Sequence, residues 1–152
     1  MIKVNVEVNS NPWHGKVKSP KKYFYKKIKK ISKFIPYLKK KNIIFTILLT
    51  NSFNIKKLNK KFRNLNRSTD VLSFPYYSLD NLKSIKEKKI YIGDIAICYE
   101  IINARSKKKF FHLELDKVWV HGLLHLLGYN HKKNKDYLKM NKIEKKFLNL
   151  IN

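Results

Sequence analysis

The chain has 152 residues, 43% of them hydrophobic, and a formal net charge of +25 at pH 7. This length and composition predict that residues 1–152 form a single domain. No apolar run is long enough to span a bilayer, so no membrane partner is expected. The one cysteine, Cys98, excludes an internal disulfide and favours a cytoplasmic protein.

The first half of the chain alternates strand and helix patterns. Strands are indicated by period-two alternation or short β-branched runs, and helices by apolar residues every three or four positions. In chain order we expect a strand at 1–8, a loop at 9–18, a helix from Ser19 to about Ile35 ended by Pro36, a strand at 42–50, and a helix capped by Asn51 or Asn54. Arg63 lies near the end of that last helix.

The second half begins with a polar loop and ends in helices. We expect a short strand stopped by Pro75, a loop at 76–89, a strand at 90–98, a short helix at 100–106, a helix from Phe110 or Phe111 that carries two histidines, and a closing helix at 134–151. This order of elements predicts an α+β, α/β-like fold in which helices cover a small sheet.

The high basic charge favours a polyanionic partner, of which nucleic acid is the commonest. The chain has 32 lysines but only three arginines, Arg63, Arg67 and Arg105. Many lysines could simply cover solvated faces, and that explanation stays open. Arginine differs because its planar guanidinium can hold a phosphate or a carboxylate, such as Asp70, through two hydrogen bonds. Asp70 itself is either a turn carboxylate or a site residue.

Three of the five histidines lie between His121 and His131. His121 and His125 are four residues apart and so share one face of a helix, which Gly128 can end in a left-handed conformation. The chain can then turn back and bring His131 to the same point. Three imidazoles that converge in this way form an open zinc site. Hydrogen-bonded core histidines are the alternative, which this spacing disfavours.

The spacing His-x3-His-x2-Gly-x2-His also occurs in metzincin proteases, which carry a Glu general base directly after the first histidine. Gly122 stands at that position, so a zinc peptidase or amidase would lack its base. His112 is out of phase with His121 and is predicted not to be a ligand. Glu114 is nearly in phase, and it is either a solvated carboxylate or an outer partner of the site.

His121 to His131 resembles the signature of the YbeY family of bacterial zinc-dependent endoribonucleases, His-Gly-x-Leu-His-Leu-x-Gly-Tyr-Asp-His. Asn130 replaces the Asp of that signature, and it keeps a carbonyl acceptor but loses the charge. Leu58-Asn59, Arg63 and Thr-Asp-Val-Leu-Ser-Phe-Pro at 69–75 are similar to a second family motif, and Gly-Asp-Ile-Ala at 93–96 to a third.

The resemblance implies a mixed, mainly parallel four-stranded sheet covered by about five helices, with a zinc site in a cleft. It also implies a single-strand-specific, zinc-dependent endoribonuclease, a hydrolase acting in maturation of the 3′ end of small-subunit (16S) ribosomal RNA and in ribosome quality control. His121, His125 and His131 would bind one zinc ion per chain, and His121 and Arg63 would take part in catalysis, Arg63 by stabilising phosphoryl charge.

Ribosomal RNA, ribosomal proteins and an assembly GTPase are the partners implied by the same resemblance. A non-enzymatic ribosome-binding factor with a structural metal is a further alternative. Structural zinc sites usually have four protein ligands, which argues against it.

Overall fold

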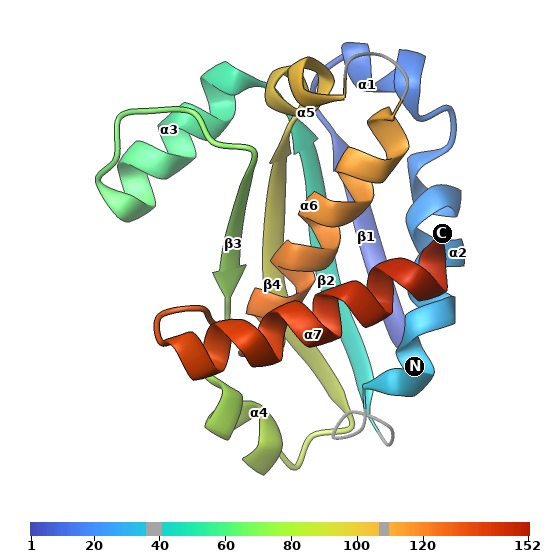
Figure 1. The fold of residues 1–152 in the computed structure, drawn as a ribbon, viewed down its shortest axis with the longest axis vertical. Helices are drawn as coiled ribbons and strands as arrows, with labels where there is room; N and C mark the ends of the chain where they lie inside the picture. The colour runs from blue at the N-terminus through green and yellow to red at the C-terminus, as the bar shows by residue number, and fades with distance from the viewer. Residues whose placement is uncertain (36–40, 107–109) are drawn as a thin grey trace.

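The protein is built on one four-stranded sheet with the strand order β1-β2-β4-β3, as a computed structural model of residues 1–35, 41–106 and 110–152 shows (Figure 1). The strands are β1 (Ile2–Val8), β2 (Asn42–Thr50), β3 (Val71–Pro75) and β4 (Lys89–Cys98). β1, β2 and β4 pair in parallel, whereas β3 runs antiparallel to β4. The expected mixed, mainly parallel sheet is therefore confirmed; the predicted helix end at Pro36 lies outside the described residues.

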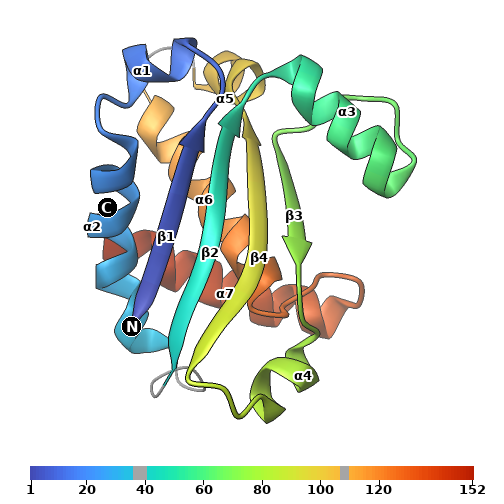
Figure 2. The same cartoon turned by 180° about the vertical axis from the view of Figure 1, so that it is seen from behind.

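Three long helices lie on one face of this sheet: α2 (Pro20–Ile31), α6 (Phe111–Leu126) and α7 (Asn134–Ile151). α6 packs on β3 and β4, α2 packs on β1, and α7 contacts both α6 and α2. Viewed from behind, the strands stand in front of α6 and α7 (Figure 2). The buried apolar side chains of β2 alternate along the strand, as the period of two requires: Ile43, Phe45, Ile47 and Leu49. Because α6 is held between the sheet and α7, its position relative to β3 is fixed.

A smaller core lies between α3 (Ser52–Arg63) and the β3–β4 edge of the sheet. Its buried side chains are Ile55, Leu72, Ala96 and Cys98. The side chain of Asn51 accepts a hydrogen bond from the Asn54 N–H at 2.9 Å, so Asn51 is the residue that caps α3. α3 ends where Asn64 takes a left-handed conformation with φ of 57°.

Two segments predicted to be loops contain short helices, so those predictions were wrong. α1 (Pro12–Lys16) lies within 9–18, and α4 (Leu79–Ser84) lies within 76–89. Trp13 of α1 is fully buried and donates its indole N–H to the Thr50 carbonyl at 2.9 Å. Leu82 of α4 is also fully buried. Each short helix is anchored by one large apolar side chain, and one residue creates no period that a pattern could detect.

With α5 (Tyr99–Arg105), the described part of the chain contains seven α-helices rather than about five. None of the helices in the described ranges has the length and apolar character needed to cross a bilayer.

Candidate metal centre

The turn after α6 brings the third histidine back towards the first two. Gly128 donates its N–H to the His125 carbonyl at 2.9 Å, and Tyr129 donates to the Leu124 carbonyl at 3.0 Å, which closes the helix end. Gly128 has φ of +84°, and a Cβ there would lie 2.7 Å from the Leu79 Cα of α4. Glycine is therefore required both for the backbone conformation and for the close approach of α4.

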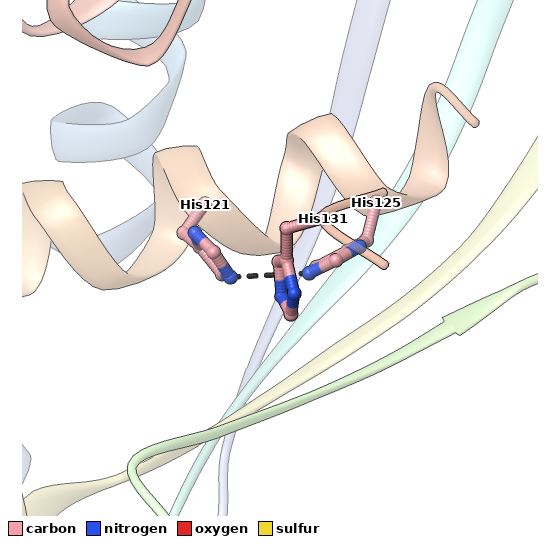
Figure 3. A group of neighbouring side chains, drawn as sticks. All are labelled: His121, His125 and His131. Atoms are coloured by element: carbon pink, nitrogen blue, oxygen red, sulfur yellow. Dashed lines mark hydrogen bonds between the residues drawn. The ribbon is translucent and has the colours of Figure 1, made fainter. Parts of the chain in front are cut away.

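The three histidines converge as the sequence predicts (Figure 3). His121 Nε2 and His125 Nε2 are 3.1 Å apart, and one ring nitrogen from each of His121, His125 and His131 falls within 4.8 Å of the others. His121 and His125 are half-buried, whereas His131 is exposed. These residues are positioned to bind a metal ion.

The donor set fits a cation on chemical grounds. His125 Nδ1 lies 3.0 Å from the Tyr129 carbonyl, which can only accept, so Nδ1 carries the hydrogen and Nε2 directs a lone pair towards His121. Such a lone pair needs a cation or a proton opposite it. Zinc–nitrogen bonds of about 2.0–2.1 Å in a tetrahedron place two ligand nitrogens roughly 3.3 Å apart, close to the separation observed here.

The pKa of His125 is lowered to about 4. Burial of the ring is the main cause, followed by the nearby charge of His121, with smaller contributions from His131 and Arg63. The imidazole is therefore neutral at physiological pH, which is the protonation state that binds a metal.

Arg63 reaches the same place from a different part of the chain. A cavity of about 780 Å³ is lined by Arg63 and Ser73 together with His125 and His131. Arg63, an exposed residue, donates from Nη2 to the Ser73 carbonyl of β3 at 3.4 Å. Among the described residues, no carboxylate lies within ion-pair distance of its guanidinium. Arg63 therefore lines the cavity with two of the three histidines and has no ion-pair partner among the described residues.

Asp70 pairs with Arg105, so Arg105 rather than Arg63 is the arginine that holds this carboxylate. Burial alone would raise the pKa of Asp70, but the hydrogen bond and charge of Arg105 lower it below 3.8. Glu114 pairs with Lys117 at 2.6 Å. His112 stacks near Tyr23, with ring centres 5.4 Å apart, and is not part of the three-histidine group.

Asn130 keeps a structural role at the position where the family signature has Asp. Its side-chain oxygen accepts a hydrogen bond from the Lys132 N–H at 3.2 Å and so supports the turn that carries His131. This contact uses the carbonyl oxygen that Asn and Asp share and does not need the missing charge.

Sequence reasoning missed one neighbour of the histidines, Glu144 of α7, whose Oε1 lies 3.3 Å from His121 Nδ1. Only a weak pattern in the sequence could have pointed to Glu144. It follows the buried Met140 by four residues and precedes the buried Phe147 by three, so a carboxylate lies beside the apolar stripe of the closing helix.

Gly122 packs directly against the sheet. A Cβ at this position would lie 2.8 Å from Ile95 Cγ2 of β4 and 3.1 Å from Ser73 Oγ of β3. The position after His121 therefore faces the sheet and has no room for the carboxylate that a metzincin-type peptidase needs.

The family model described as "Endoribonuclease YbeY" matches residues 8–152. The chain belongs to this family. It is 44% identical over 146 residues to Endoribonuclease YbeY of Pelagibacter ubique, covering 95% of this chain and 92% of that protein. Its identity to Endoribonuclease YbeY of Buchnera aphidicola subsp. Acyrthosiphon pisum is 40% over 139 residues, covering 88% and 82%.

The fold is similar to the solution structure of TM1509 from Thermotoga maritima, with a TM-score of 0.61 and 28% identity over 99% of this chain and 89% of that one. The resemblance inferred from three short motifs is thus confirmed. Membership of the YbeY family supports an endoribonuclease function, which is a hydrolase activity.

Proposed function

We propose that this YbeY-family chain is a zinc-dependent endoribonuclease that cleaves single-stranded RNA, matures the 3′ end of 16S rRNA and takes part in ribosome quality control. The observation that carries the proposal is the shared cavity, which is lined by Arg63 together with His125 and His131. A cation site and an arginine guanidinium in one cavity suit a phosphodiester, whose negative charge increases on the way to the transition state.

His121, His125 and His131 would hold the metal through neutral ring nitrogens. Three nitrogen donors favour zinc over magnesium or calcium, which prefer oxygen ligands. When bound, zinc supplies a Lewis acid for a phosphoryl oxygen and lowers the pKa of water at the site. The guanidinium of Arg63 would donate two hydrogen bonds to the phosphoryl oxygens. Its side chain has the freedom to do so, because its one described hydrogen bond, to Ser73, is long.

The substrate proposal also draws on charge. A net charge of +25 supports sequence-independent attraction to RNA phosphates, which positions a strand without reading its sequence. Ribosomal proteins and an assembly GTPase remain the proposed protein partners. The cytoplasm remains the proposed compartment, in keeping with the single cysteine, Cys98, which is buried and free.

Two rival functions predict different behaviour. A zinc peptidase or amidase needs a carboxylate base after the first histidine, and the packing of Gly122 against Ile95 disfavours one there. A ribosome-binding factor with a structural metal would have a closed site with four protein ligands. The described part of the chain offers three histidines beside an open cavity.

The test is cleavage of an end-labelled single-stranded RNA and of a duplex of the same sequence by the zinc-loaded protein. We expect internal cleavage of the single strand, little cleavage of the duplex, and loss of both zinc and activity in His125→Ala. A fluorogenic peptide serves as the control substrate. Peptide cleavage without RNA cleavage would favour the peptidase, and tight zinc binding with neither activity would favour the ribosome-binding factor.

A further inference from the structure

Each of the two histidines on α6 has one ring nitrogen directed at the proposed metal position and one directed away from it. The two Nε2 atoms face each other at 3.1 Å. On the far side of the rings, His125 Nδ1 meets the Tyr129 carbonyl at 3.0 Å, and His121 Nδ1 meets Glu144 Oε1 at 3.3 Å. Both outer partners are acceptors, and they come from different parts of the chain.

Glu144 lies on the neighbouring helix α7 and is half-buried beside His121. α7 crosses α6 at this point, and the buried side chains of Met140 and Phe147 hold α7 against the core one turn before and one turn after Glu144. The Glu144 side chain is 22% exposed and that of His121 is 32% exposed. The Glu144–His121 pair is therefore better shielded from solvent than a fully exposed contact. The packing of α7 on α6, rather than the flexibility of the side chains, sets the distance between the two groups.

We infer that Glu144 is a positioning residue for the metal centre: its carboxylate accepts the Nδ1–H of His121 and so fixes the ring with the Nε2 lone pair directed at the metal. The inference rests on the proposed metal site. A carboxylate in this position selects one tautomer, holds the ring plane and makes the ligand nitrogen more basic. Without it, His121 could place its hydrogen on either nitrogen, and one of the two tautomers cannot bind a metal through Nε2.

The same contact bears on what the two Nε2 atoms can bind. With Nδ1–H of His121 donated to Glu144 and Nδ1–H of His125 donated to the Tyr129 carbonyl, neither Nε2 carries a hydrogen when the rings are neutral. Two lone pairs at 3.1 Å repel each other, and a cation bound between them removes that repulsion.

The chain provides a matched control in the same neighbourhood. Glu114 and Glu144 both line a cavity of about 270 Å³ beside His121. Glu114, however, pairs with Lys117 at 2.6 Å and has no described contact with His121. Glu114→Gln and Glu144→Gln each remove one negative charge near the metal centre, but only the second changes the group that touches a proposed ligand.

The experiment measures zinc affinity of the full chain by competition with a chromogenic chelator at fixed pH. We expect Glu144→Gln, which keeps the size and one acceptor oxygen, to bind zinc about 10-fold more weakly, and Glu144→Ala up to about 100-fold more weakly. Glu114→Gln should change the affinity by less than about threefold, because it alters only a more distant, screened charge. Melting curves of the metal-free proteins check that each variant folds.

A second readout reports the tautomer directly. Nitrogen NMR of the histidine rings in the zinc-loaded protein should show His121 protonated at Nδ1 and metal-bound at Nε2, and Glu144→Ala should broaden or shift the His121 Nδ1 signal while His125 stays unchanged.

Zinc affinity that is equal in the wild type, Glu144→Ala and Glu114→Gln would overturn the inference while leaving the proposed zinc enzyme intact. A wild-type chain that binds no zinc would overturn both. Equal weakening of zinc binding in Glu144→Gln and Glu114→Gln would also overturn the inference about Glu144, because the loss of a nearby negative charge would then account for the effect.

Discussion

Replacing Arg63 with Lys keeps the positive charge in the cavity but removes the planar fork. An ammonium group can reach one phosphoryl oxygen, whereas the guanidinium can donate to two at once. Loss of one donor that stabilises a transition state lowers kcat by about 10²–10³-fold. Because Arg63→Lys retains the charge, we expect the lower end, about a hundredfold, which corresponds to about 2.7 kcal/mol in activation free energy.

The cost to folding should be much smaller. The described hydrogen bond of Arg63, to the Ser73 carbonyl, is 3.4 Å long, and the side chain is exposed. Such a bond contributes at most about 0.5–1 kcal/mol to stability. Zinc content should not change, because the guanidinium is not a ligand. The effect on catalysis should therefore exceed the effect on stability severalfold in Arg63→Lys.

Single-turnover cleavage of single-stranded RNA and the melting temperature are measured on one preparation, with Arg67→Lys as the control. Arg67 is exposed on the loop after α3 and does not line the cavity. We expect Arg67→Lys to cleave nearly as fast as the wild type. Full activity in Arg63→Lys would remove this residue from catalysis, and a rate that falls only in parallel with the melting temperature would make it an anchor for β3.

Four other perturbations test separate parts of the reasoning. Elemental analysis should find about one zinc per chain and little in His125→Ala, and full retention there would refute the ligand assignment. RNA affinity should fall steeply with salt, since lysine–phosphate contacts release counterions, and a flat titration would mean that the lysines only solubilise the chain. Asp70→Asn should be less stable than the wild type in urea at neutral pH. Because the native pKa of Asp70 lies below 3.8, that difference should persist down to this pH and shrink as the pH falls further; a constant difference at about pH 2 would contradict the role of Arg105. Gly122→Ala should lose about 1–3 kcal/mol of stability, because its Cβ would overlap Ile95, and an unchanged unfolding free energy would show that the sheet relaxes freely.

The sequence by itself determined the features that depend on short spacings. His121 and His125 share a helix face because they are four residues apart, and the helix ends before Gly128 because this glycine takes a left-handed conformation. The strands β1, β2 and β4 were readable for the same reason, since alternation and β-branched runs are local properties. The grouping of the histidines and the individual strands therefore followed from distances along the chain, whereas the number and direction of the strands in the sheet were implied by the family resemblance.

Only the tertiary structure decided which distant residues meet. Arg63 faces the histidines because α3 ends beside β3, and Glu144 reaches His121 because α7 crosses α6 at one particular position. Arg105, rather than Arg63, takes Asp70 for a similar reason. These partners are separated by tens of residues, and their approach depends on how helices pack across a sheet. No local period encodes that packing, because it is set by the fit of whole buried surfaces.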